Sequence, residues 1–204
     1  MKKDYVLGIL FFGSLWGASE AAVGGYLYGA HIQHASAPLT VIAFAILTIA
    51  TLYLPQKGSA TLTGSIAMLY KFLNTPFYAC HLLAIFLLGV SYDVGLHLIR
   101  IRNKQLLGLS ATYLGYVLFV LTITYVFRYH YWTEGGLPKI IRYVGISGTL
   151  AACGNTVIVP LSHRLGSLLK ARTVNPFAFT SRLATVSVSV LTVALWIAGM
   201  ARWF

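Results

Sequence analysis

Charged side chains are scarce in this sequence, and acidic ones are the scarcest. Only 9% of the 204 residues are charged, and just four of them are Asp or Glu. A soluble globular domain carries about 25% charged residues, whereas 58% of this chain is hydrophobic. The composition therefore excludes a soluble domain and indicates one integral membrane domain, residues 1–204.

Cysteine is almost as rare, and motifs for nucleotides or cofactors are missing. Cys80 and Cys153 lie in different apolar segments and form no CxxC pair, so we expect buried thiols and no metal site. No GxxxxGK[ST] loop occurs, so ATP-driven transport requires a separate ATPase partner. The last apolar segment has no lysine for a retinal Schiff base, which excludes an opsin. We therefore expect no catalytic chemistry.

Long apolar stretches recur along the whole chain, and most are near the roughly 20 residues that a helix needs to cross a bilayer. We count seven, at about residues 6–28, 37–54, 58–74, 77–98, 106–127, 142–161 and 182–203. The third is short and rich in small and hydroxylated residues, so it is either a half-span or a crossing inside the bundle. The sequence predicts an all-α, polytopic transmembrane helix bundle of six or seven spans.

The basic residues are distributed unequally between the two sides of these segments. With a cytoplasmic N-terminus, ten lie on the inner side: Lys2, Lys3, Lys57, Arg100, Arg102, Lys104, Arg164, Lys170, Arg172 and Arg182. Five lie on the outer side: Lys71, Arg128, Lys139, Arg142 and Arg202. Because Lys and Arg accumulate in cytoplasmic connections, we predict this orientation, in the plasma membrane. The net charge of +11 then reflects topology and contact with membrane lipid, and no nucleic-acid partner is expected.

Small residues line one side of the first segment at helical spacing. Two neighbouring rows recur every four residues: Gly13, Gly17, Ala21 and Gly25, and beside them Ser14, Ala18 and Ala22. Such rows let another backbone approach closely, so we predict that this face packs against neighbouring helices or a partner subunit. Glu20, the only acid in the segment, lies within this face. Its carboxylate costs about 2.5–3.5 kcal/mol in the membrane unless it finds a polar partner.

The predicted topology brings five residues together in the outer half of the bilayer: Glu20, Lys71, Asn74, His81 and Trp132. Apolar walls with a few placed polar groups are typical of a small-molecule pocket. We predict that Glu20 and Lys71 orient a polar or zwitterionic ligand. Asn74 and His81 then add hydrogen bonds, and Trp132 closes the site. The structural alternative is that Lys71 reaches the membrane surface and His81 is an interfacial histidine.

A second polar group lies near the predicted cytoplasmic side. Asp93 and His97 are four residues apart, hence on one helix face, and Arg100 and Arg102 follow. The favoured interpretation is an Asp–His or Asp–Arg pair that anchors a helix end. The alternative is a proton relay, in which Asp93 and His97 pass protons toward the cell interior.

Residues 145–148, Gly-Ile-Ser-Gly, match the GxSG pattern of the rhomboid intramembrane proteases. The serine of that family needs a histidine from another helix. The only later histidine, His163, lies 16 residues beyond Ser147 on the same predicted helix. At 1.5 Å per residue the two are ~24 Å apart, far beyond hydrogen-bond reach, so we reject a protease.

Histidines at the ends of the apolar segments leave a second class of function open. His81 lies on the outer side, and His97 and His163 lie on the inner side. Two stacked bis-histidine haem b sites need about this arrangement, although the candidates for a fourth ligand lie in connections. The alternative function is therefore a structural or electron-transfer subunit of a larger membrane complex, binding haem b through His81, His97 and His163.

Residues 15–24, LWGASEAAVG, resemble the LWGxxEAxxG-type first span of a class of small prokaryotic membrane proteins. In size and span pattern the first four segments are similar to S-components, the substrate-binding subunits of energy-coupling-factor vitamin transporters. The resemblance implies an outward-opening substrate pocket. It also implies an AxxxA motif, matched by Ala18 and Ala22, that docks on a transmembrane coupling subunit. A solute-binding transport subunit is thus the function that we expect.

Overall fold

The computed structural model describes residues 3–73 and 79–172, which are almost entirely helical. The elements are α1 (Lys3–Gly29), α2 (Ser36–Tyr53), α3 (Ser59–Leu69), η1 (Tyr70–Leu73), α4 (Ala79–Asp93), η2 (Val94–Leu98), α5 (Lys104–Leu121), η3 (Thr122–Val126), α6 (His130–Arg142), η4 (Tyr143–Gly148) and α7 (Thr149–Arg172). η1 is a 3₁₀ turn, and η2, η3 and η4 are π-helical turns that extend neighbouring helices. The prediction of an all-α protein is confirmed for these residues. Asn74 and the predicted segment 182–203 lie outside them.

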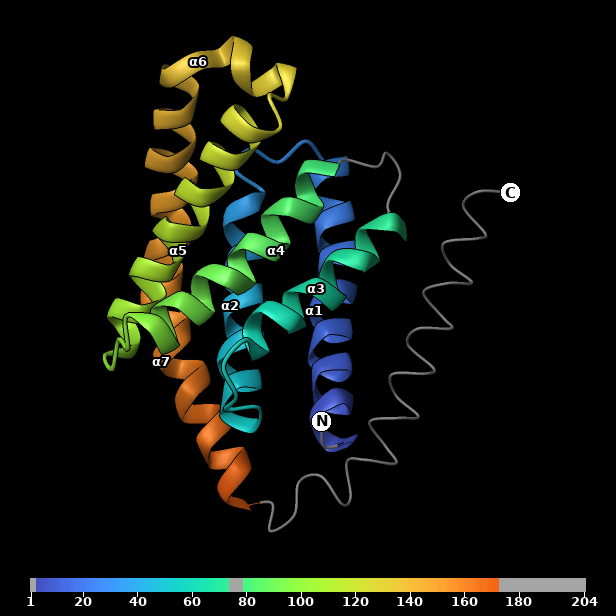
Figure 1. Cartoon of the computed structure of the whole chain (residues 1–204), viewed down its shortest axis with the longest axis vertical. Coiled ribbons are helices and arrows are strands. Elements are labelled where there is room, and N and C mark those ends of the chain that lie inside the picture. The colour runs from blue at the N-terminus through green and yellow to red at the C-terminus, as the bar shows by residue number, and fades with distance from the viewer. Residues whose placement is uncertain (1–2, 74–78, 173–204) are drawn as a thin grey trace.

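Five helical stretches are long and apolar enough to cross a membrane: Asp4–Gly29, Ser36–Tyr53, Ala79–Leu98, Lys104–Val126 and His130–Ala171. α1, α3 and α5 run in one direction and α2, α4 and α7 in the other, so that α1, α3 and α5 begin toward the end of the bundle at which α7 finishes (Figure 1). The described residues that we predict to be cytoplasmic belong to this end. These features fit a multi-pass membrane protein, while the total of six or seven spans and the orientation stay predictions.

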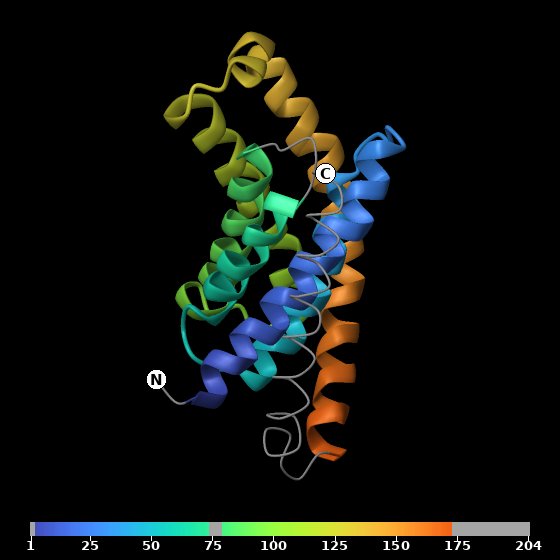
Figure 2. The ribbon, with the colours of Figure 1, turned by 90° about the vertical axis from the view of Figure 1, so that its right-hand side faces the viewer.

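The helix that carries the predicted segment 142–161 is longer than that segment at both ends. α6, η4 and α7 form a nearly continuous run from His130 to Arg172, so most of the stretch 128–141 is helical. Gly136 interrupts the run with a φ of 55°, which glycine adopts at little cost, and Pro138 lies in the turn that follows. α5 and α7 thereby extend past α4 and carry α6 at their tip (Figures 1 and 2).

The predicted segment 58–74 forms a helix that is too short to cross a bilayer alone. α3 has 11 residues and η1 has four. Together they rise about 25 Å, less than the ~30 Å hydrocarbon core. The helix lies obliquely against α1 and α4, and Ala60, Thr63 and Ala67 on it are fully buried (Figure 1). Its small and hydroxylated residues therefore face protein, as the half-span interpretation requires.

Two glycines of the first small-residue row bring α1 against α3. A Cβ atom added at Gly13 lies 2.6 Å from Cβ of Ile66 and 2.9 Å from the backbone oxygen of Thr63. One added at Gly17 lies 2.5 Å from the ring of Tyr70. Real Cβ atoms do not approach this closely, so Gly13 and Gly17 pack the interface inside this molecule.

The second row of small residues turns from the inside of the bundle toward the outside along α1. Ser14 is only 2% exposed, Ala18 is half-buried and Ala22 is exposed, as are the neighbouring Leu15 and Val23. Ala21, which belongs to the first row, is half-buried. A helix face of small and apolar exposed residues suits contact with lipid or with another membrane subunit. The docking role predicted for Ala18 and Ala22 stays a prediction.

The core lies where α1, α2 and α4 meet. Trp16 and Phe44 are fully buried, and the ring of Phe44 meets that of Tyr92 edge-on with the centroids 5.2 Å apart. The Tyr92 hydroxyl lies 2.8 Å from Oγ1 of Thr48, so the phenol at the centre of the core has a hydrogen-bond partner. These contacts pack α1, α2 and α4 together, and the same three helices carry polar residues described below.

Gly17→Leu is expected to lower the free energy of unfolding, because the new side chain collides with the Tyr70 ring. Overpacking of this kind costs about 1–3 kcal/mol. Ala22→Leu is the matched control on the same helix, since leucine there is exposed and has nearly the helix propensity of alanine. Thermal unfolding in mild detergent measures both variants. Equal midpoints for the two would contradict the α1–α3 contact.

Candidate functional site

Glu20 and Lys71 form an ion pair inside the bundle. Nζ of Lys71 lies 3.1 Å from Oε2 of Glu20 and donates a 3.0 Å hydrogen bond to the Glu20 backbone oxygen. Only 6% of the Glu20 side chain and 4% of the Lys71 side chain is exposed. Nε1 of Trp16 donates to the other carboxylate oxygen over 3.4 Å. Both oxygens of the buried carboxylate therefore have partners.

The local structure makes room for this pair. Lys71 projects from η1, at the end of α3, and the missing side chain of Gly24 leaves space for its amine. A Cβ atom at Gly24 lies 3.0 Å from Nζ. The pair thus ties the end of α3 to α1. The alternative that Lys71 reaches the membrane surface is wrong, because its amine points inward to Glu20.

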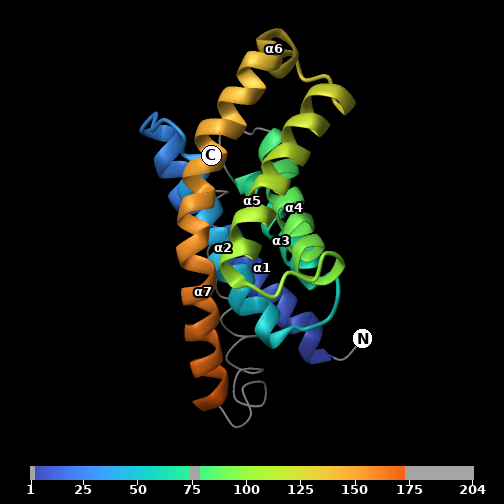
Figure 3. The same cartoon turned by 90° about the vertical axis from the view of Figure 1, so that its left-hand side faces the viewer.

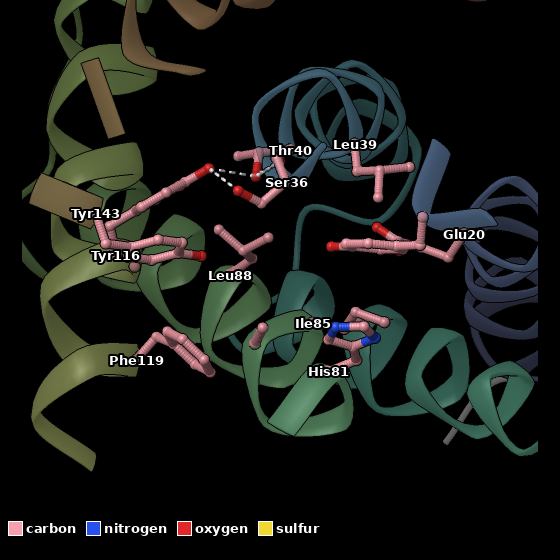
Figure 4. Close-up of a pocket in the computed structure, with 13 residues that line it drawn as sticks. Glu20, Ser36, Leu39, Thr40, His81, Ile85, Leu88, Tyr116, Phe119 and Tyr143 are labelled. Atoms are coloured by element: carbon pink, nitrogen blue, oxygen red, sulfur yellow. Dashed lines mark hydrogen bonds between the residues drawn. The ribbon is translucent and has the colours of Figure 1, made fainter. Parts of the chain in front are cut away.

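A small cavity adjoins the ion pair. Its volume is about 50 Å³, and it lies between α1, α2, α4, α5 and η4 (Figure 4). The apolar part of its wall consists of Leu39, Ala84, Ile85, Leu88 and Phe119. The polar residues gather at two ends, one with Glu20 and His81 and the other with Tyr116 and Tyr143 (Figure 4). Glu20 and His81 of the predicted ligand site therefore lie in the wall of this cavity, while their role in binding a ligand stays a prediction.

At the first end, an aromatic ring links the ion pair to the histidine. The rings of Tyr28 and His81 are stacked, with centroids 4.7 Å apart and 21° between their planes. Nζ of Lys71 lies 5.8 Å from the centroid of the Tyr28 ring, a distance at which the cation is attracted to the ring. Lys71 is thus held between the Glu20 carboxylate and Tyr28, and Tyr28 covers one face of His81.

The second end was not predicted from the sequence. The Tyr116 hydroxyl lies 3.4 Å from Oγ of Ser36 and 3.4 Å from Oγ1 of Thr40 (Figure 4). Tyr143 stacks on Tyr116 with the ring centroids 5.2 Å apart. Ser36 and Thr40 are four residues apart on α2, a spacing that places two hydroxyls on one helix face. That spacing is the one feature of the sequence that could have indicated this polar end. It does not indicate that the two hydroxyls contact a residue of α5.

Trp132 lies outside the cavity wall. Its ring packs edge-on against Phe119 and Tyr143, at centroid distances of 5.5 and 5.1 Å, and both of those residues line the cavity. Only 7% of Trp132 is exposed. Trp132 therefore supports the wall from behind and does not close the site. Asn74, the remaining predicted ligand residue, falls outside the described residues.

The cavity volume limits what the site holds in this conformation. A water molecule needs on the order of 10–15 Å³ of such volume, so about 50 Å³ has room for a few waters. Pockets for drug-sized ligands measure about 300–1,000 Å³. A solute of that size therefore enters only if the walls move apart.

Asp93 anchors the start of α3. Its Oδ2 accepts hydrogen bonds from the backbone N–H of Thr61, at 2.7 Å, and from the Thr61 hydroxyl, at 2.6 Å. Thr61 is the third residue of α3, and the N-cap residue Gly58 has no side chain to satisfy that N–H. A carboxylate at this position supplies the missing acceptor and faces the positive end of the helix dipole. Asp93 therefore anchors a helix end, but through α3 rather than through an arginine.

His97 lies beside Asp93 without a hydrogen bond to it. Nε2 of His97 is 3.8 Å from Oδ1 of Asp93, and both atoms are buried without a hydrogen-bond partner. Proton transfer needs contact at about 2.6–3.2 Å, directly or through a water. The proton-relay alternative for Asp93 and His97 thus has no direct hydrogen bond to carry its first step.

Ser147 has a histidine partner that sequence spacing did not suggest. Nδ1 of His34 lies 2.8 Å from Oγ of Ser147, although 113 residues separate them. His34 belongs to the α1–α2 connection and has a φ of 58°, while Ser147 lies in η4 and is 2% exposed. Ser147 does not line the cavity, and a serine buried to this degree offers a substrate no access. We interpret the contact as an anchor that fastens the α1–α2 connection to the helix of α7.

The surroundings of two of the three candidate haem ligands, His81 and His97, leave no room for a porphyrin in this conformation. Tyr28 covers one face of His81, and the cavity of about 50 Å³ beside that histidine is too small for the macrocycle. Nε2 of His97 is buried and faces Asp93. His163 lies on α7 and is half-buried. Within residues 3–73 and 79–172, no group of three His, Cys, Asp or Glu side chains is placed to hold a metal ion.

Comparison with protein-family models, with curated proteins and with solved structures gives no match. The resemblance of residues 15–24 to the first span of S-components therefore stays a prediction. The features of the molecule that bear on its function are a buried ion pair, a small cavity beside it, and two polar anchors at Asp93 and Ser147.

Asp93→Ala is expected to destabilise the protein by about 1–3 kcal/mol, because two Thr61 donors lose their acceptor in a buried place. Asp93→Asn is the matched control, since its amide oxygen still accepts these hydrogen bonds and only the charge is lost. Thermal or chemical unfolding of the detergent-solubilised protein compares them. If the two variants lose the same stability, the hydrogen bonds to Thr61 do not anchor α3.

A double-mutant cycle tests the anchor between His34 and Ser147. The single variants His34→Ala and Ser147→Ala and the double variant are expected to show a coupling of about 1 kcal/mol in unfolding free energy, the usual value for one hydrogen bond. Strictly additive effects would mean that the two side chains do not interact. Labelling of Ser147 by a fluorophosphonate probe would instead indicate a reactive serine and contradict the purely structural interpretation.

Proposed function

We propose that this protein is a membrane-embedded solute-binding subunit of a transporter, similar to an S-component and located in the plasma membrane. The observation that carries the proposal is the buried Glu20–Lys71 pair, since the Glu20 carboxylate also lines a small cavity. Buried charges within membrane spans are expensive, and they commonly mark substrate or ion pathways. All five candidate spans contribute residues to this cavity, the fifth of them through Tyr143 of η4.

The ligand that best suits the site is polar or zwitterionic. Its ammonium group can pair with Glu20 while its carboxylate pairs with Lys71, so that one internal ion pair is replaced by two pairs with the ligand. Both buried charges stay compensated during this exchange, which avoids the penalty of an unpaired buried charge. The His81 ring can hydrogen-bond to the ligand near Glu20. The Tyr116 hydroxyl can hydrogen-bond to it at the opposite end of the cavity.

Binding of such a solute requires the cavity to widen. Tyr28 is a wall residue near the end of α1, and 37% of its surface is exposed. The Tyr28 ring stacks on His81 and its centroid lies 5.8 Å from Nζ of Lys71, so the ring contacts both polar side chains at this end of the cavity. Displacement of Tyr28 would therefore give a ligand access to His81 and Lys71.

The proposal also implies partner subunits. The sequence contains no GxxxxGK[ST] loop, so a separate ATPase supplies the energy of transport. The open face of α1, with Ala18 half-buried and Ala22 exposed, is the surface proposed to dock a transmembrane coupling subunit. This face is separate from the glycines that pack against α3.

The test uses a variant that removes both charges at once. Glu20→Gln alone leaves Lys71 buried and unpaired, which costs about 3–5 kcal/mol; Glu20→Gln combined with Lys71→Met avoids this. Thermal shift with a panel of zwitterionic amino acids, and with their neutral N-acetyl amides as controls, measures binding. A zwitterion at 100 times its Kd is expected to stabilise the native protein by about 2.7 kcal/mol and the double variant not at all.

Two results would contradict the proposal. If the double variant keeps the same ligand-induced stabilisation, Glu20 and Lys71 have a structural role only. If native protein extracted in mild detergent carries redox subunits and shows a Soret band, the alternative of an electron-transfer subunit holds. Co-purification of an ATPase pair, by contrast, supports the transport assignment.

A further inference from the structure

A second cavity lies on the surface of the bundle between α5 and α7, and its volume is about 280 Å³. We call it the α5–α7 groove, and its lining consists of Gln105, Thr156, Val157, Pro160, Leu161 and Arg164. Five of these residues lie along one face of α7, because 156, 160 and 164, and likewise 157 and 161, follow one another at intervals of four residues. α7 continues past the start of α5 (Figure 3), so the groove lies at the level where α5 begins.

The apolar part of the groove lies within a candidate membrane span. Val157 is 67% exposed and Leu161 is 56% exposed, and both belong to the stretch His130–Ala171. α5 and α7 touch closely at Gly108 and Asn155, so the groove is an opening beside a tight helix contact and not a loose interface. Apolar surface exposed at this depth faces the hydrocarbon of the membrane. A lipid acyl chain is therefore the group that suits the apolar part of the groove.

The polar end of the groove is positively charged. Arg164 lies there with Gln105, next to Lys104, and Arg100 and Arg102 precede them in the chain. After Asp93 the chain has a single acidic residue, Glu134, which lies on α6 at the opposite end of the bundle. No acidic side chain of α5 or α7 therefore neutralises this group. An arginine guanidinium binds phosphate through two parallel hydrogen bonds.

Side chains rather than backbone supply the donors at this end. The Asn103 side chain already accepts the backbone N–H groups of Gln105 and Leu106 at the start of α5. The first turn of α5 is thereby capped, which leaves the Arg164 guanidinium and the Gln105 amide as donors for an anion. A groove with an apolar channel inside the span and these donors at its end matches a phospholipid more closely than a free anion.

We propose that the α5–α7 groove binds one anionic phospholipid from the leaflet at this end of the bundle. One acyl chain lies along Val157 and Leu161, and the phosphate contacts Arg164 and Gln105. Anionic lipids enrich the cytoplasmic leaflet, which is the side predicted for these residues from the distribution of basic charge. The inference does not depend on the solute site between α1 and α5.

Native mass spectrometry of the full-length protein tests this, with phosphatidylglycerol and phosphatidylcholine added separately at equal concentration. The native protein is expected to retain one phosphatidylglycerol in preference to phosphatidylcholine. Arg164→Gln should weaken the phosphatidylglycerol adduct about tenfold, the effect of losing one charge-assisted contact. Lys57→Gln is the matched control, because it removes the same charge from an exposed position at the same end and should leave the adduct unchanged.

A second variant distinguishes lipid binding in the groove from general attraction between basic residues and anionic lipid. Val157→Trp fills the exposed apolar channel without changing any charge, and it should weaken the adduct even if Arg164→Gln fails to fold. Equal losses in Arg164→Gln and Lys57→Gln would show nonspecific attraction and overturn the site. The same conclusion follows if Val157→Trp retains the lipid, or if the native protein binds both lipids equally.

Discussion

The buried ion pair between Glu20 and Lys71 is the constraint on which the surrounding structure depends. Neither charge is tolerable alone in the interior of a membrane bundle, since an unpaired buried ion costs several kcal/mol. Lys71 must therefore lie at the same depth as Glu20. It does so because α3 and η1 end inside the bundle. Glycines at 13, 17 and 24 of α1 let these elements approach closely enough for the pair to form.

The short helix α3 is held at both of its ends by charge. Asp93 accepts hydrogen bonds from Thr61 at the N-terminus of α3, and Lys71 follows its C-terminus. Each charge is thus opposite in sign to the partial charge of the helix end beside it, which is favourable. A helix too short to span the bilayer cannot be fixed by hydrophobic matching alone. Two polar anchors, one to α4 and one to α1, define its depth and tilt instead. The cavity beside Glu20 thus inherits its position from interactions at both ends of α3.

Hydropathy and charge sufficed to predict the helical bundle, because backbone groups in a membrane must be satisfied within helices. The desolvation cost of Glu20 also pointed to a polar partner. The sequence did not reveal that Lys71 binds Glu20 directly, nor that His34 meets Ser147 across 113 residues, since these contacts depend on helix rotation. The predicted segments also left residues 128–141 as a connection, whereas most of this stretch is helical and bends at Gly136, which has a positive φ. Tertiary contacts between distant segments carry no periodic signal.

In the proposed function, the small cavity and the ion pair have the same explanation. A site with two permanent opposite charges is stable without ligand only if these charges neutralise each other, and their contact at 3.1 Å leaves a volume of about 50 Å³ beside them. A zwitterion that separates the pair gains two ionic contacts for the one that it breaks, so opening and binding are energetically coupled. A neutral solute of the same size has no such compensation. Selectivity for charge thereby follows from the pairing that makes the empty state stable.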